Sequence, residues 1–60
     1  MKAYRCYFLN EMDHIASVEL INCQHDEDAT TMATKLLNER RHRAAEIWDG
    51  GRMVNRIDLD

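Results

Sequence analysis

The chain has 60 residues, a formal net charge of −3, two glycines and no proline. A domain of this length buries about 60% of the surface of its unfolded chain, so its stability is marginal unless a disulfide, a metal or oligomerisation adds to it. The hydrophobic share of 45% excludes a disordered chain, and the acidic balance argues against a general nucleic-acid binder.

Two strands joined by a polar turn are predicted at the start of the chain. Residues Ala3–Leu9 are rich in aromatic side chains, and Ile15–Cys23 is apolar and β-branched. With Asp13 in the left-handed conformation that Asp tolerates, Asn10 pairs with His14 and sets the register of the hairpin.

This register gives the hairpin an apolar face and a mixed face. The mixed face places Arg5 opposite Glu19, a favourable cross-strand pair. The apolar face carries Tyr4, Cys6, Phe8, Ala16, Val18 and Leu20.

A helix is predicted for Asp26–Arg41, with Asp26 as its N-cap. Basic residues at its end, Arg40, Arg41 and Arg43, complement the helix dipole. Apolar residues recur at helical spacing on one face, namely Ala29, Met32, Ala33, Leu36 and Leu37.

A second hairpin is predicted after the helix. Arg43–Asp49 alternates weakly, Gly50–Gly51 is a strong turn signal, and Met53–Leu59 forms the last strand. In this register Trp48 pairs with Met53, and Ile47 pairs with Val54.

We therefore predict one small α+β domain over residues 1–60, with the element order β-β-α-β-β. Two hairpins form a mostly antiparallel four-stranded sheet, and the helix packs on one face. The sequence pattern leaves the strand order between the two hairpins open.

A single helix leaves the other face of such a sheet uncovered. The open face is predicted to carry Tyr7, Leu9, Ile15, Ile21, Trp48, Met53 and Ile57. Apolar patches of this kind mark partner surfaces, and burying each side chain contributes roughly 1.5–3 kcal/mol. The pattern favours a non-enzymatic interaction module, a homodimer or a binder of a protein partner, which docks through Tyr7, Ile15, Trp48, Met53 and Ile57.

The alternative is a nucleic-acid-binding or regulatory protein. Arg40, Arg41 and Arg43 would contact phosphates, while Tyr7 and Trp48 would stack on bases. The helix dipole explains the same basic cluster without a ligand, so nucleic acid is disfavoured.

No nucleophile–base pair or glycine-rich phosphate loop is visible in the sequence, so we expect no enzyme and no cofactor. The cysteines and histidines lack zinc-site spacing, so no metal is expected. Cys6 and Cys23 would lie roughly 17 Å apart along the hairpin, beyond disulfide reach.

The start of the chain lacks the apolar run of a signal peptide, and no segment approaches the roughly 20 apolar residues of a membrane span. We therefore expect a cytoplasmic protein with reduced cysteines and no membrane association.

Three short motifs, Tyr4–Leu9, Asp13–Ile15 and Glu46–Gly50, surround the acid-started helix. Together they resemble a set of short alphaproteobacterial proteins of the rhizobial type, grouped as a domain of unknown function. The resemblance spans nearly the whole chain, and it departs at Met12-Asp13, where Asp-Gly is common in the family. It implies a small cytosolic protein and supplies no activity.

Overall fold

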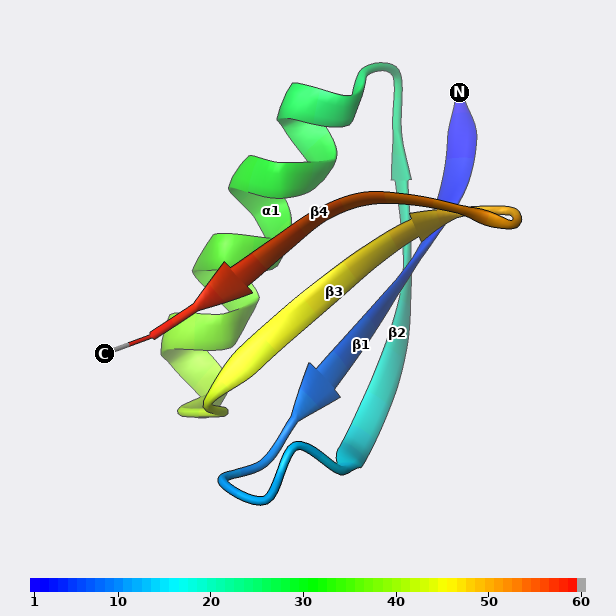
Figure 1. Cartoon of the computed structure of the whole chain (residues 1–60). Coiled ribbons are helices and arrows are strands. Elements are labelled where there is room, and N and C mark those ends of the chain that lie inside the picture. Colours follow the sequence, from blue (N-terminus) through cyan, green and yellow to red (C-terminus); the bar gives the residue numbers. More distant parts are fainter. Residues whose placement is uncertain (60) are drawn as a thin grey trace.

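The computed structural model describes residues 1–59, and this part of the chain forms four strands and one helix (Figure 1). The strands are antiparallel, they lie in the order β2-β1-β3-β4, and α1 packs on one face of the sheet. The predicted α+β class and the order β-β-α-β-β are confirmed. The elements are β1 (Lys2–Leu9), β2 (Ile15–Cys23), α1 (Asp26–Arg40), β3 (Ala44–Asp49) and β4 (Arg52–Asp58).

The core lies between α1 and the central strands. The helix carries the chain from β2 at one edge back to β3, so that β1 is paired on both sides. Ala29 and Ala33 are fully buried on α1, and their small side chains allow the helix to approach the sheet closely. The remaining buried members of this core are Tyr4, Cys6, Phe8, Ile21, Cys23, Leu37, Ala45 and Ile47.

The register of the first hairpin differs from the predicted one. A bulge between Phe8 and Leu9 leaves Leu9 opposite Ile15, as predicted, but shifts every pair beyond it by one residue. Because side chains alternate along a strand, this shift exchanges the two faces of β2. The predictions for four residues of β2 are therefore wrong, since Ala16, Val18 and Leu20 are exposed and Ile21 is buried under the helix.

The predicted pair of Arg5 with Glu19 is also wrong. Glu19 lies opposite Cys6 on the helix side, where Arg40 Nη1 binds Glu19 Oε2 at 2.8 Å. The Arg40 guanidinium also lies over the Phe8 ring, 5.6 Å from its centroid. These two contacts hold the C-terminal end of α1 against the helix-facing side of β1 and β2.

The ends of α1 explain its length. His25 occupies the N-cap position in an extended conformation without a side-chain cap, so the predicted cap at Asp26 is one residue late. Arg41 adopts a left-handed conformation (φ 58°) that ends the helix. Met32, predicted as core, is 43% exposed.

The second hairpin turns at Gly50, whose φ of +61° suits a glycine, and Trp48 pairs with Met53 as predicted. One extra residue then enters β4, so Ile47 faces Asn55 rather than Val54. This bulge turns Ile57 to the helix side, where it packs against the core.

Candidate functional site

The face of the sheet turned away from α1 is the candidate site, and strand pairing arranges its side chains in rows. From β2 to β4, the rows are Leu20–Arg5–Trp48–Met53, Val18–Tyr7–Glu46–Arg56 and Ile15–Leu9–Ala44–Asp58.

Arg56 binds several acids on the β4 half of this face. Its guanidinium lies 3.1 Å from a Glu46 carboxylate oxygen, 3.2 Å from Asp58 and 3.1 Å from Asp13 in the turn between β1 and β2. Asp58 and Asp13 together raise the pKa of Arg56. The side chain thus reaches from β4 across β3 to the opposite hairpin.

The ion-pair cluster of Arg56 lies beside the third row. Asp58 stands at the β4 end of the row, and Arg56 joins Asp58 to Asp13 in the turn between β1 and β2. In the middle of the row, Leu9 and Ala44 are buried although neither belongs to the core under α1. The β4 half of the open face is therefore partly covered by the chain itself, and the predicted exposure of Leu9 is wrong.

The β2 half of the same face is bare. Ile15 is 62% exposed, Val18 53% and Leu20 67%. Tyr7, beside Val18 on β1, is half-buried. We call Ile15, Val18 and Leu20 the β2 patch.

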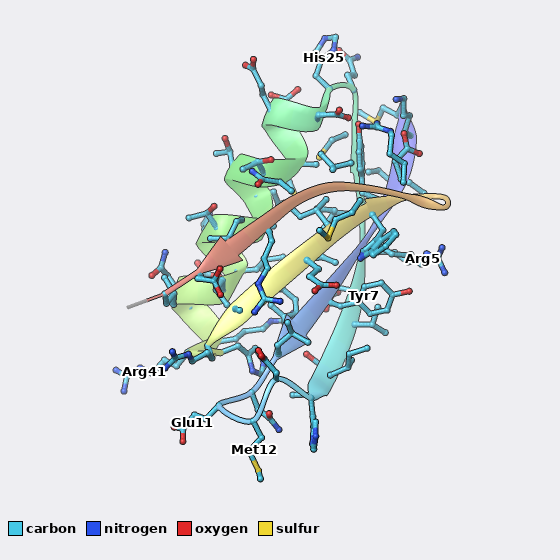
Figure 2. All side chains as sticks on the ribbon, in the orientation of Figure 1. Arg5, Tyr7, Glu11, Met12, His25 and Arg41 are labelled. Atoms are coloured by element: carbon cyan, nitrogen blue, oxygen red, sulfur yellow. The ribbon has the colours of Figure 1, made fainter. Side chains whose placement is uncertain are left out.

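A shallow depression of about 440 Å³ lies between the β2 patch and the β3–β4 turn. The Trp48 indole N–H donates to Glu46 at 3.2 Å, and Arg5 donates to the Gly50 carbonyl at 3.0 Å. Figure 2 shows Arg5 and Tyr7 projecting from β1 away from α1. The lining residues are Arg5, Tyr7, Ile15, Glu46, Trp48, Gly50 and Gly51.

The predicted interface residues fall in two groups. Tyr7, Ile15, Trp48 and Met53 lie on the open face or at its rim. Ile57 lies on the other side of the sheet, so its predicted place on the open face is wrong.

Val18 and Leu20, the residues that sequence reasoning missed, are exposed large apolar side chains of this face. The other alternating set of β2 contains Ser17 and Glu19, so the alternation favoured Val18 and Leu20 as the inward residues, which is the wrong face.

The basic residues predicted to bind nucleic acid do not join the aromatic residues of the open face. Arg40 is engaged with Glu19 on the helix side, and Arg41 and Arg43 are exposed beside the first turn. Figure 2 shows Arg41 on the opposite side of the molecule from Tyr7. One nucleic-acid strand lying flat on the open face would therefore not contact both groups.

A second polar cluster surrounds the start of α1. The Tyr4 hydroxyl donates to Asp26 at 2.7 Å, Arg52 binds Asp26 at 3.3 Å and Asp49 at 3.2 Å, and Lys2 binds Asp49 at 3.1 Å. The hydrogen bond to Asp26 raises the pKa of Tyr4 to about 12 and lowers that of Asp26. The pKa of Asp49 is lowered by Lys2 and Arg52. This cluster ties the helix start to the β3–β4 hairpin.

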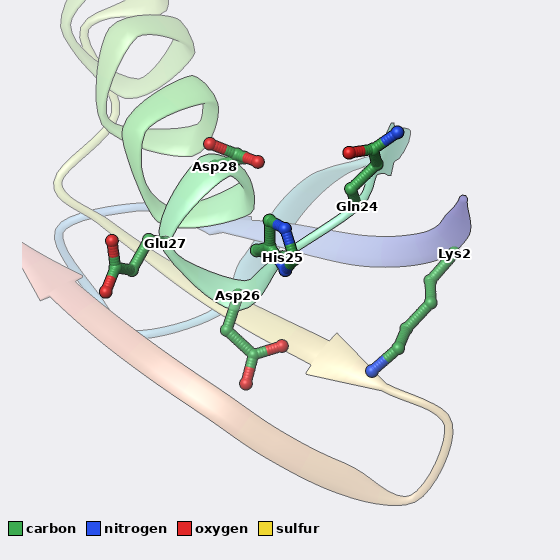
Figure 3. A pocket seen from close by; sticks show the side chains of 6 residues that line it. All are labelled: Lys2, Gln24, His25, Asp26, Glu27 and Asp28. Carbon is green, nitrogen blue, oxygen red and sulfur yellow. The ribbon is translucent and has the colours of Figure 1, made fainter.

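The hollow beside this cluster does not bring its acids together. Figure 3 shows the carboxylates of Asp26, Glu27 and Asp28 pointing in different directions. The Tyr4 side chain is fully buried, so a substrate cannot reach its hydroxyl. Both observations assign the cluster to stability, where acids favour the positive end of the helix dipole.

In residues 1–59 no group of His, Cys, Asp and Glu is placed to hold a metal ion. Nor does this stretch contain a helix of the length and hydropathy that a membrane span requires. No family model, curated protein or solved structure matches the chain. The resemblance to the alphaproteobacterial proteins therefore stays a prediction.

Proposed function

We propose that this protein is a non-enzymatic interaction module that associates with a second copy of itself through the open face of its sheet. The observation that carries the proposal is the β2 patch, Ile15, Val18 and Leu20, each more than half exposed on one strand. Exposed apolar side chains gathered on one rigid element are typical of partner surfaces.

The energy available from the patch is large for a chain of this size. Fully burying a Val, Leu or Ile side chain contributes about 1.5–3 kcal/mol, and these three are already partly covered, so together they supply a few kcal/mol. A small domain has a total stability of about 5 kcal/mol or less. Self-association is a usual means by which a chain of 60 residues becomes stable.

Sedimentation velocity of the full chain between about 1 and 100 µM tests the proposal, because this range brackets a micromolar Kd. We expect the unmodified protein to dimerise and Leu20→Glu, which puts a charge into the patch, to weaken the dimer at least ~100-fold. Met32→Glu is the matched control, since Met32 is an exposed apolar residue on α1, across the sheet from the patch.

Met32→Glu should sediment like the unmodified protein. A protein that remains monomeric throughout this range would overturn the proposal. The same conclusion would follow if Leu20→Glu, shown to be folded by circular dichroism, dimerised as well as the control does.

A further inference from the structure

Within residues 1–59, the outer edge of β2 has no neighbouring strand. The order β2-β1-β3-β4 places β2 at one edge of the sheet, with β1 as its single strand neighbour in the part of the chain that the structure describes (Figure 1). Alternate N–H and C=O groups along Ile15–Cys23 therefore point outward without a strand partner. An edge of this kind is a template for another strand.

The two edges of the sheet differ in how they are protected. On β4, Arg52, Arg56 and Asp58 are exposed, and the extra residue Val54 makes a bulge. Charges and bulges of this kind prevent edge-to-edge pairing. On β2 the charged residue is Glu19, which is already bound by Arg40 on the helix side. The β2 edge has a bulge of its own at Ala16, but Ser17–Cys23 runs on from it without interruption and carries no other charge.

We propose that β2 pairs with β2 of a second copy, antiparallel, so that the two sheets become one. The inference rests on the self-association proposed above, and it places the contact at the β2 edge that borders the open face. A two-fold axis perpendicular to the sheet would place both helices on the same side. The exposed side chains of both β2 patches would then pack side by side.

Charge selects the register of this pairing. Paired residues in a sheet lie on the same face, so with such an axis one residue of β2 must face its own copy. Centring on Glu19 would set two carboxylates opposite each other, which is unfavourable. Centring on Leu20 would set Glu19 opposite the apolar Ile21 and Val18 opposite Asn22.

Centring on Val18 satisfies a group that the monomer leaves unsatisfied. The Ser17 hydroxyl oxygen is buried and finds no hydrogen-bond partner within residues 1–59. In this register Ser17 lies opposite Glu19 of the second copy, whose carboxylate accepts hydrogen bonds. Leu20 then lies opposite Ala16, the small extra residue of the β2 bulge, where the regular part of the ladder ends. Val18 faces Val18 at the axis.

Disulfide cross-linking between two copies tests directly which residue of β2 faces its own copy. Three single-cysteine variants of β2 are made in the full chain, namely Val18→Cys, Glu19→Cys and Leu20→Cys. Each also carries Cys23→Ser, which removes the native thiol of β2. The native Cys6 is fully buried, and burial raises its pKa to about 11, so it stays silent.

Under mild oxidation, Val18→Cys should form linked dimers about tenfold faster than Leu20→Cys or Glu19→Cys, because disulfides need closely facing Cβ atoms. Met32→Cys on α1 reports random collisions and should link no faster than those two. Hydrogen exchange of the unmodified protein is a second measurement. Protection of β2 amides should rise with concentration, while that of β4 amides should not.

The possible outcomes separate the two proposals. A dimer in which Val18→Cys links no faster than Met32→Cys, or in which β2 amides gain no protection, would overturn the β2 pairing and leave self-association through another part of the open face. Faster linkage through Glu19→Cys or Leu20→Cys would overturn the proposed register. A protein that sediments as a monomer would remove both proposals.

Discussion

Tyr4 joins the sheet to the helix through a single short hydrogen bond to Asp26. The lowered pKa of Asp26 means that its ionised form stabilises the fold. This contribution is present above the ordinary Asp pKa of about 4 and is lost as the pH falls through the lower, folded-state pKa. The pKa of Tyr4 is raised to about 12, so the contribution of its protonated form is complete below about pH 10 and is lost as the pH rises towards 12.

Tyr4→Phe should therefore lower the free energy of unfolding at neutral pH. It should also make that free energy depend less on pH, both below about pH 4 and above about pH 10. We expect Tm to fall by about 5 °C at pH 7, since a buried hydrogen bond to a charged acceptor is lost from a very small domain. Urea unfolding at a series of pH values measures the effect. Tyr7→Phe, on the open face, is the control and should keep the full pH dependence. If the unfolding free energies of Tyr4→Phe and Tyr7→Phe depended on pH in the same way, the stabilising hydrogen bond assigned to Tyr4 would be contradicted.

At the scale of one element, the end of α1 contains a strained residue. Arg41 has a φ of 58°, and a left-handed conformation costs a residue with a Cβ atom roughly 1–2 kcal/mol. Arg41→Gly should relieve this strain and stabilise the protein by about 1 kcal/mol. Arg40→Gly is the control and should destabilise it, because Arg40 is helical and binds Glu19. Urea midpoints that fail to rise for Arg41→Gly would show that the strain is absent.

The elements themselves were predictable because their signals are local. The helix followed from apolar spacing over Asp26–Arg40, and the second turn followed from Gly50–Gly51. In β2 the polar residues Ser17 and Glu19 made the other set look like the inward one, so the pattern selected the wrong face. The bulge beside Leu9 reverses that selection, and the pair of Glu19 with Arg40 is a contact distant in sequence.

The same difficulty in assigning strand faces affected the residues predicted for the candidate site. Tyr7 and Trp48 were placed on the open face correctly, because the register between each residue and the nearest turn is free of bulges on β1 and β3. Val18 and Leu20 were assigned to the wrong face, since one bulge reverses a whole strand. Ile57 was misplaced for the same reason by the extra residue in β4.

At the scale of the whole molecule, the sheet has one face covered by α1 and one covered only in part. Arg56 joins Asp13 to Asp58 over the β4 half of the open face, and no comparable side chain covers the β2 patch. The uncovered area is therefore concentrated at one edge. A second copy paired along this edge would bury the sides of the patch side chains that face it, without disturbing the Arg56 cluster.

The midpoint of thermal unfolding should therefore depend on protein concentration. An association that binds folded chains and not unfolded ones stabilises them by mass action, by about 2.7 kcal/mol at 100 times Kd. For a domain this small, raising the concentration 100-fold should increase Tm by about 10 °C. Leu20→Glu should unfold at one temperature at every concentration, while Met32→Glu should follow the unmodified protein. A constant Tm for the unmodified protein would mean that the β2 patch stays exposed in solution, since burial between two folded chains cannot leave unfolding independent of concentration.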